Sequence, residues 1–349
     1  MTLSPPRSIL VIQLRRIGDV ILTTPAVAAL KRRHPDAAID FLAEEPGSQA
    51  LRGNPHIRRI LVYGAGPGQA LAWLWRVRRS RYDWVIDYLG NPRSALLAAA
   101  SSAAVRAGWV HVAHRWAYNL PLRQPDPAQY AGREKMLALR ALGVEADDAD
   151  FMPRVYLTDG TAPQPENLVG LAPASRQETR RWPAASFAKL GRLLRERYGC
   201  GILVFWGPGE RGLAEGVAAG IGPGARISEP TPDLAAAARL LARCRLLVAN
   251  CNGPKHLAVA LGVSTVTVHG SSDPASWTPP HPDHAAVRLA ELPCIGCRLN
   301  RCPRHRECLE FLTAERVFTA ASVILERGPA PSAGSITERV RRHLRKDAA

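Results

Sequence analysis

The chain has 349 residues, and 46% of them are hydrophobic, which is enough to build about two domain cores and excludes a disordered chain. A formal net charge of +16 predicts anionic partners, such as a nucleotide, a nucleic acid or an anionic lipid headgroup, although an arginine-rich genome would give part of the same bias. Seven cysteines in a chain of this length do not form the disulfide framework of a small secreted protein.

Neither a signal region nor a membrane-spanning segment is expected. Residues 1–8 carry no apolar stretch before the first predicted strand, and no run reaches the roughly 18 apolar residues that a spanning helix needs. We therefore predict a cytoplasmic protein, with peripheral contact at an anionic membrane surface as a further expectation.

The first half of the chain alternates strand and helix patterns in the order typical of a parallel sheet with helices on both faces. The predicted strands are Ser8–Leu14, Ala38–Ala43, Arg59–Tyr63 and Trp84–Tyr88. The predicted helices are Thr24–Arg33, Gln69–Ser80, Arg93–Ser101 and Arg133–Leu142. Trp73 and Trp75 lie among arginines in the second of these helices, and their spacing favours a half-buried helix over a nucleic-acid or lipid surface.

The alternation restarts after a proline-rich interval at Thr158–Glu166, which we interpret as a linker between domains. The predicted strands beyond it are Leu168–Ala172, Gly201–Trp206, Arg245–Ala249 and Ser264–His269. The predicted helices are Ala184–Tyr198, Asp233–Cys244 and Pro254–Leu261. Residues 1–160 and 167–327 are therefore expected to form two α/β domains whose strand carboxyl ends face one ligand-binding cleft.

Residues 328–349 are expected to form a linker and a tail helix. Ile336, Val340 and Leu344 recur every four positions among basic residues, which is the pattern of a short basic amphipathic helix. We favour packing of this helix on the N-terminal domain over contact with a membrane.

The segment Asn250–Leu257 is typical of a strand end, a tight loop and a helix start. A helix start presents unpaired backbone N–H groups and the positive end of the helix dipole, which together suit a phosphate. Gly253 lets the backbone approach a ligand closely, Lys255 adds positive charge, and His256 adds a group that donates or accepts. An ordinary strand-to-helix turn would have the same pattern.

Asp19 follows the first predicted strand, beside a glycine and before a helix. A carboxylate there is suited to act as a general base on a rigid support, and an N-cap aspartate is the alternative. In the second half, Arg180 and Arg181 lie in a loop before a helix, where they would clamp a diphosphate or form a solvated surface pair.

The segment Gly207–Gly212 matches the glycine pattern G-x-G-x-x-G of dinucleotide sites. We discount that interpretation because the segment lies in the middle of the second domain, Pro208 lacks an N–H, and Glu210 would repel a pyrophosphate. Glu210 suits contact with a ribose or a base instead.

Cys294, Cys297, Cys302 and Cys308 form a tight cluster with His305 inside it. Four thiols at this spacing suit zinc or an iron–sulfur cluster, but they do not form two C-x2-C pairs. A structural cluster of reduced thiols, or one that forms disulfides, is the alternative, and we predict no metal site.

Three motifs occur in an order that resembles glycosyltransferase family 9, the ADP-heptose:lipopolysaccharide heptosyltransferases. They are the segment around Asp19 (Arg16–Pro25), the box Arg180–Pro183, and the segment that runs from Gly253–Ala258 to His269–Pro274. The resemblance covers roughly Ile9 to Leu325. It implies a GT-B fold of two Rossmann-like domains facing a central cleft, an acceptor-binding N-terminal domain and a donor-binding C-terminal domain. It also implies an inverting transfer that needs no catalytic metal or other cofactor.

The resemblance implies a role for each matching residue. Asp19 corresponds to the general base, and Arg180 stands where the family usually has a lysine that neutralises the departing diphosphate. Ser175 corresponds to a phosphate-contacting hydroxyl and Glu210 to a nucleotide-contacting glutamate. Donor contacts are also expected from the motif residues Asn252, Gly253, Lys255 and His256, and an acceptor contact from Arg16.

The chain departs from the family pattern at Cys251-Asn252, where the family usually has Asp-Thr. A thiol supplies neither a strong acceptor for sugar hydroxyls nor a fixed negative charge, so the donor sugar is left open although ADP-heptose is implied. The implied acceptor is an anionic glycolipid at the inner face of the inner membrane. The alternatives are a nucleotide-sugar epimerase or hydrolase of the same fold, a metal-containing nucleic-acid-binding protein, and a catalytically inactive relative.

Overall fold

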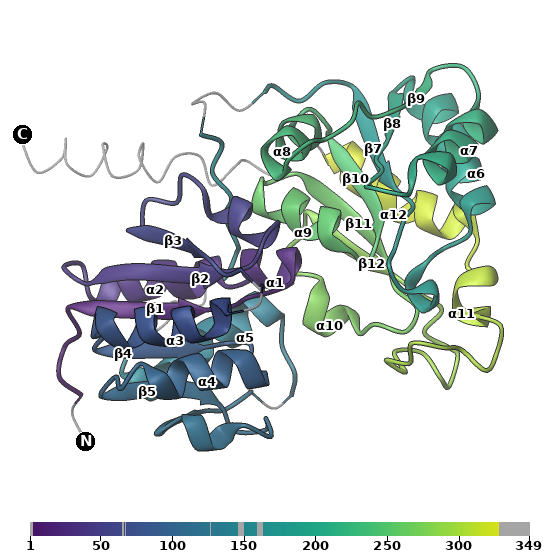
Figure 1. The fold of residues 1–349 in the computed structure, drawn as a ribbon. Coiled ribbons are helices and arrows are strands. Elements are labelled where there is room, and N and C mark those ends of the chain that lie inside the picture. Colours follow the sequence, from purple (N-terminus) through teal and green to yellow (C-terminus); the bar gives the residue numbers. More distant parts are fainter. Residues whose placement is uncertain are drawn as a thin grey trace, which may run out of the picture.

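The computed structural model describes residues 3–64, 66, 68–125, 127–145, 150–158 and 163–327, which form two α/β units in succession (Figure 1). The predicted tail helix lies outside these residues. No helix within the described part of the chain combines the length and apolarity that crossing a bilayer requires. Each unit consists of one sheet with helical layers, and the two units are in contact with each other.

The first sheet consists of six parallel strands in the order β3-β2-β1-β4-β5-β6. Their bounds are β1 Ser8–Ile12, β2 Ala38–Ala43, β3 Arg59–Val62, β4 Trp84–Asp87, β5 Val105–Trp109 and β6 Leu120–Leu122. In register, Ile9 lies beside Ile39 of β2 and Trp84 of β4. The central strands are buried on both faces, which is why they appear in the sequence as continuous apolar runs.

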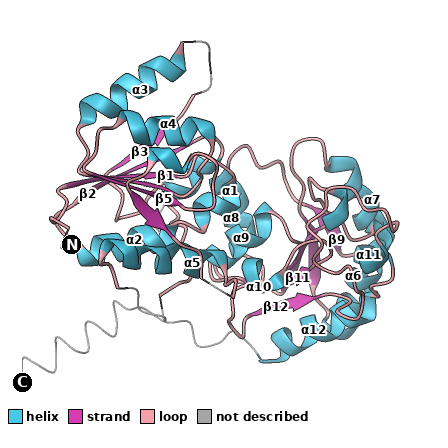
Figure 2. Cartoon of the chain, turned by 90° about the horizontal axis from the view of Figure 1, so that it is seen from below, coloured by secondary structure: helices cyan, strands magenta, loops and turns pink. Residues whose placement is uncertain are grey.

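Helices cover both faces of this sheet (Figure 2). Helices α2 (Thr24–Arg33) and α5 (Ala131–Leu137) pack on one face with the 3-10 helix η3 (Ala138–Leu142). Helices α3 (Gln69–Ser80) and α4 (Pro92–Ala100) pack on the other face, beside the 3-10 helix η2 (Arg115–Ala117). Each helix buries one apolar stripe, as Trp73 and Val77 do for α3.

The second sheet repeats this strand order as β12-β11-β10-β7-β8-β9. The bounds are β7 Leu168–Ala172, β8 Gly201–Val204, β9 Ala225–Ile227, β10 Leu246–Asn250, β11 Ser264–Val268 and β12 His284–Val287. Its helices are α6 Ala184–Tyr198, α7 Arg211–Ile221, α8 Leu234–Ala242, α9 Gly253–Ala260, α10 Pro274–Trp277, α11 Glu307–Glu310 and α12 Ala314–Arg327, with the 3-10 helix η4 Glu178–Arg180. Helices α6, α7 and α12 cover one face, and α8 and α9 cover the other.

The two α/β units meet through an apolar contact and through hydrogen bonds such as that from the Leu234 N–H to Gln49 Oε1 at 2.8 Å. Ile21 of α1 (Ile17–Ile21) and Ala50 of the 3-10 helix η1 (Gly47–Leu51) join the core formed by α8 and α9. In both sheets the strand order reverses at the first strand, between β1 and β4 and between β7 and β10. Ligands of such sheets bind outside the carboxyl ends of the strands at this reversal. The fold therefore predicts a ligand site at the loops after β1, β7 and β10.

The elements predicted from strong apolar patterns agree with the structure to within about two residues. The missed elements include the short strands β5 (VRAGW) and β6 (LPL), the glycine-containing α7, and the amphipathic α12 of 14 residues. The predicted helix Arg133–Leu142 is divided into α5 and η3. Strand β1 ends at Ile12 rather than Leu14, because the chain turns there toward α1.

Candidate active site

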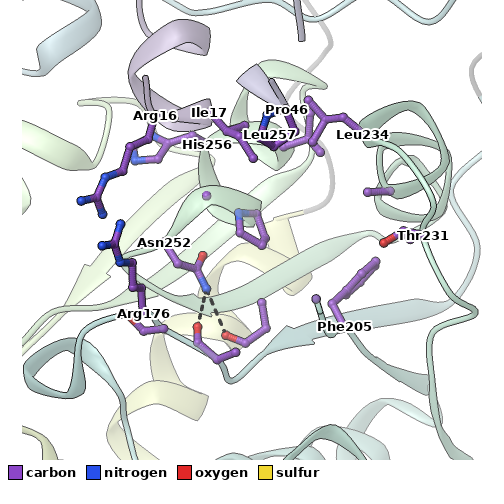
Figure 3. A pocket seen from close by; sticks show the side chains of 18 of the residues that line it. Arg16, Ile17, Pro46, Arg176, Phe205, Thr231, Leu234, Asn252, His256 and Leu257 are labelled. Carbon is purple, nitrogen blue, oxygen red and sulfur yellow. Dashed lines mark hydrogen bonds between the residues drawn. The ribbon is translucent and has the colours of Figure 1, made fainter. Parts of the chain in front are cut away.

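A cavity of about 570 Å³ lies between the two sheets (Figure 3). The first sheet contributes α1 and the segment around Pro46, and the second contributes the loops after β7, β8 and β10. The predicted site residues that line this cavity are Arg16, Asp19, Ser175, Arg180, Glu210, Asn252, Gly253 and His256. Residues up to 240 positions apart in the sequence thus line one cavity. It lies at the carboxyl ends of the strands, beside the point in each sheet where the strand order reverses.

The cavity has a basic end and an apolar end. Figure 3 shows Arg16 and Arg176 at the same edge, with their guanidinium groups pointing toward one another from the two domains. Phe205, Leu234 and Leu257 lie toward the opposite side of the view. Such a polarised cavity suits a ligand with an anionic part and a flat apolar part.

Asp19 is half-buried in the first turn of α1 and lines the cavity. Its Oδ2 accepts a hydrogen bond from the backbone N–H of Arg16 at 3.2 Å. Arg16 is the N-cap residue of α1, so Asp19 is the third residue of the helix and not the N-cap aspartate of the alternative interpretation. A carboxylate has further lone pairs besides the one that this bond uses, and these remain able to accept a hydroxyl proton.

A buried lysine that sequence analysis did not identify lies behind Asp19. The Lys135 Nζ of α5 donates to the Asp19 carbonyl oxygen at 2.9 Å, to Gln13 Oε1 at 2.9 Å and to Thr23 Oγ1 at 2.8 Å. Burial lowers the pKa of Lys135 to about 8, while the Asp19 and Glu134 carboxylates oppose the shift. These bonds tie α5 to the middle of α1 and to the residues before and after it, and they fix the backbone that carries Asp19.

Gly18 and His256 bring the two domains into close contact. A Cβ atom on Gly18 would lie 2.8 Å from Cδ2 of His256, so only glycine fits this position without displacement of the ring. The ring packs edge-on against Trp277, with centroids 5.9 Å apart. Burial lowers the pKa of His256 far below its ordinary value, and Lys255 adds to that effect, so the imidazole is neutral at pH 7.

Two asparagines at the end of β10 and in the loop after it form hydrogen bonds with the loop after β7. Asn250 Nδ2 donates to the Pro173 carbonyl oxygen at 2.7 Å, and Asn252 Nδ2 donates to the Ala174 carbonyl oxygen at 2.8 Å (Figure 3, for Asn252). Asn252 is also the N-cap of α9, where its Oδ1 accepts from the Lys255 N–H at 3.3 Å. The Asn252 amide is therefore already bonded within the protein.

The N-terminus of α9 opens on the cavity. Gly253 is the first helical residue, and a Cβ atom placed on it would meet no atom within 4 Å. The glycine thus leaves open space in front of the positive end of the helix dipole. Cys251, two positions before Gly253, is buried but also lines the cavity.

The two adjacent arginines of the Arg180–Pro183 box have different environments. Arg180 lines the cavity, and its Nε atom is buried without a hydrogen-bond partner among the described residues. The same holds for Oε1 of Gln177, a cavity residue that the sequence did not single out. Arg181 instead donates from Nη2 to the Ser175 carbonyl oxygen at 2.7 Å and holds the loop after β7.

Two other predicted donor contacts are engaged within the protein. Lys255 does not line the cavity, because its buried ammonium group donates to the carbonyl oxygen of Trp277. Burial lowers the pKa of Lys255 to about 8. Glu210 lines the cavity, and its Oε2 accepts from the Gly207 N–H at 2.9 Å, which stabilises the turn before α7.

The cysteine cluster lies apart from this cavity. Cys294, Cys297, Cys302 and Cys308 are free thiols, and Cys302 Sγ accepts a hydrogen bond from the Arg306 N–H at 3.3 Å. Burial, followed by the neighbouring Cys302, raises the pKa of Cys308 to about 11. The described part of the chain holds no group of three or more His, Cys, Asp or Glu side chains placed to bind a metal ion.

Comparison with known proteins identifies the family of the chain. The chain is 25% identical over 348 residues to lipooligosaccharide heptosyltransferase 2 of Haemophilus ducreyi, covering 91% of this chain and 99% of that protein. A family 9 glycosyl transferase structure from Veillonella parvula superposes with a TM-score of 0.76 at 24% identity, covering 92% of this chain and 97% of that one.

The structure of Escherichia coli ADP-heptose lps heptosyltransferase II gives a TM-score of 0.73 at 21% identity, over 92% of this chain and 99% of that one. These superpositions confirm the predicted GT-B fold. The profile named "Glycosyltransferase family 9 (heptosyltransferase)" matches residues 71–306, which is more than half of the chain. The chain is therefore a glycosyltransferase and belongs to glycosyltransferase family 9.

Proposed function

We propose that the chain transfers a heptose from ADP-heptose to a lipopolysaccharide precursor or a related glycolipid, with inversion at the anomeric carbon. The observation that carries this proposal is the polarised cavity, in which Asp19 of one domain faces the α9 N-terminus and Arg180 of the other. The names of the relatives, which are heptosyltransferases for lipopolysaccharide or lipooligosaccharide, supply the sugar and the acceptor class.

In this mechanism Asp19 takes the proton of the acceptor hydroxyl as its oxygen attacks the anomeric carbon. The bond from that carbon to the diphosphate oxygen breaks, and negative charge develops on the departing nucleoside diphosphate. Arg180 and the first N–H groups of α9 stabilise this charge, with the Ser175 hydroxyl as a further contact. Arg16, on the first domain, is assigned to the anionic acceptor.

The remaining assignments depend on the position of each group. We assign the adenine to the apolar end near Phe205 and the ribose to Glu210, since both side chains line the cavity. The neutral imidazole of His256 contributes a hydrogen-bonding group between the general base Asp19 and the donor. Lys255 and Asn252 act by fixing the loops, because their polar groups are engaged within the protein.

Thermal stabilisation by a panel of ADP, UDP, GDP, CDP and TDP tests the donor side of the proposal. A ligand that binds only the folded chain raises the melting temperature, so ADP should stabilise the protein and the other diphosphates should not. Selective stabilisation by another nucleotide would contradict the ADP-heptose assignment. A folded protein that responds to none of them would contradict the proposed donor site.

Incubation with ADP-heptose alone separates transfer from the alternative activities of this fold. A transferase releases ADP quickly only when acceptor is present, whereas a hydrolase turns the donor over without it. An epimerase changes the sugar itself, which the recovered donor would reveal. Rapid turnover without acceptor would therefore contradict the proposed transfer.

A further inference from the structure

The solvent-facing side of α3 and its neighbours carries large apolar side chains together with arginines. Trp75 is 63% exposed and Leu71 is 73% exposed, although Trp73 and Val77 of the same helix are buried against the sheet. The helix is thus half-buried, as the sequence predicts, but its outer side is not simply polar. An exposed tryptophan is costly to leave in water, because the indole presents a large apolar surface.

The arginines of this helix are not balanced by acidic side chains. Residues 68–82 contain the arginines Arg76, Arg78, Arg79 and Arg81 and no Asp or Glu. None of the four forms an ion pair with a carboxylate of the described residues. The guanidinium of Arg79 lies over the Trp75 ring, with its Cζ 5.0 Å from the ring centroid.

The elements next to α3 also expose large apolar side chains and carry no acidic residues. Helix α4 packs beside α3 and exposes 48% of Leu96, and η2 packs beside α4 and exposes 61% of Trp116. Neither α4 nor η2 contains an acidic residue. We call this surface, defined by Leu71, Trp75, Arg76, Arg78, Arg79, Leu96 and Trp116, the basic–apolar face.

We propose that the basic–apolar face is a docking surface for a bilayer that contains anionic lipid. Tryptophan and leucine side chains insert at the boundary between headgroups and acyl chains, and arginines bind the lipid phosphates around them. The absence of carboxylates from α3, α4 and η2 matches the negative surface potential of such a bilayer. A soluble acidic protein would fit the arginines but would leave the exposed tryptophans without an apolar partner.

Docking through this face would bring a membrane-bound acceptor to the active site, an argument that rests on the proposed glycolipid acceptor. Helix α3 follows β3, so its first turn lies near the carboxyl edge of the first sheet, the same edge at which α1 and Asp19 follow β1. Leu71 is in that first turn, whereas Arg79 is at the far end of the helix. A bilayer on this face would present a glycolipid headgroup at the edge where Asp19 lies.

Vesicle flotation with no donor or acceptor present tests the docking surface by itself. The probes are phosphatidylcholine vesicles and vesicles in which about one third of the lipid is phosphatidylglycerol. We expect binding to the anionic vesicles only, weakened by added salt. The variant Trp75→Ser/Arg79→Gln should bind about tenfold more weakly, since it loses one basic residue near the lipid phosphates and the insertion of one indole.

A matched variant in the second domain serves as the control. Phe311 is 67% exposed and Arg226 is exposed on β9, so Phe311→Ser/Arg226→Gln removes one exposed aromatic and one charge far from α3. It should bind vesicles like the wild type. Equal binding by the Trp75→Ser/Arg79→Gln variant and the wild type would overturn the proposal, as would binding of duplex DNA but not vesicles.

ADP stabilisation and transfer to a deacylated, water-soluble acceptor report on the proposed function separately. Both should be unchanged in Trp75→Ser/Arg79→Gln if the surface acts only in docking. Vesicle binding without ADP stabilisation would refute the proposed function and support the docking surface. Transfer activity in a wild-type protein that binds no vesicles would refute the docking surface alone.

Discussion

The Asp19 carboxylate lines the cavity, while its backbone is held by hydrogen bonds on the side away from the cavity. The buried ammonium group of Lys135 holds the Asp19 carbonyl oxygen, and the Arg16 N–H holds one carboxylate oxygen. A general base must stay within hydrogen-bond reach of the proton that it removes, and these two contacts restrict its position. Lys135 is therefore a positioning residue for the proposed base.

Replacement of this base should abolish transfer while leaving the fold and the donor site intact. In Asp19→Asn the amide oxygen can still accept from the Arg16 N–H, but the side chain cannot take a proton. We expect kcat to fall by about 10²- to 10⁴-fold, measured as sugar transfer to acceptor, with unchanged stabilisation by ADP. Turnover close to that of the wild type would show that another group is the base.

Of the nine site residues that the sequence predicts, all but Lys255 line the cavity, because they lie in or beside the loops that follow strands. The sequence does not predict Lys135, which is 116 residues from Asp19 and lies on a helix with no distinctive motif. It also does not reveal that Lys255 is turned away from the cavity, since a lysine beside a helix N-terminus has the same sequence pattern in either orientation. Side-chain direction depends on packing that the local pattern does not contain.

At the scale of elements, the contact between α1 and α9 joins the proposed base to the donor site. Two glycines lie at this contact, and they have opposite surroundings. Gly18 faces the His256 ring, whereas Gly253 faces open cavity. The same substitution should therefore have different consequences at the two positions.

Gly18→Ala should destabilise the protein, because the new Cβ would overlap His256 and force α1 away from α9. We expect a loss of about 1–3 kcal/mol in the free energy of unfolding, measured with urea, together with reduced transfer. Gly253→Ala should keep near-normal stability but weaken ADP binding, because its methyl group occupies space in front of the helix N-terminus. Equal stability of the two variants would contradict the close packing described for Gly18.

The strand patterns predict the two sheets well because their central strands are buried on both faces and are rich in aliphatic residues. Among the elements that the sequence leaves out, the strands β6, β9 and β12 lie at sheet edges, where they are short and partly exposed. Such strands form because a neighbouring strand offers a hydrogen-bonding edge, which is a tertiary effect.

At the scale of the whole molecule, two buried lysines make stability depend on pH. Burial lowers the pKa of Lys135 and of Lys255 from 10.5 to about 8. Between these values the unfolded chain holds more protons than the native chain, so each lysine makes the free energy of unfolding rise with pH. This contribution is fully present above pH 10.5 and is lost as the pH falls through 8.

Urea unfolding of the wild type and of Lys135→Met at about pH 7.5 and pH 9.5 isolates one of these lysines. The rise in stability with pH should be smaller in the variant by about 1–2 kcal/mol, at roughly 1.4 kcal/mol per pKa unit. Buried thiols such as Cys244, whose raised pKa has the opposite effect, are common to both proteins and cancel in the difference. Identical pH dependence in the two proteins would contradict the lowered pKa of Lys135.

The repeated strand order has an evolutionary consequence. The proposed base and acceptor contacts are carried by the first domain and the proposed donor contacts by the second, and α1 and η1 of the first domain pack against α8 and α9 of the second. Substitutions that change the recognised acceptor can accumulate in one half while the nucleotide-sugar cradle in the other is preserved. Cys251, which departs from the pattern that the family resemblance implies, lies in the donor half, so we expect its effect on the sugar that is recognised there and not on the acceptor.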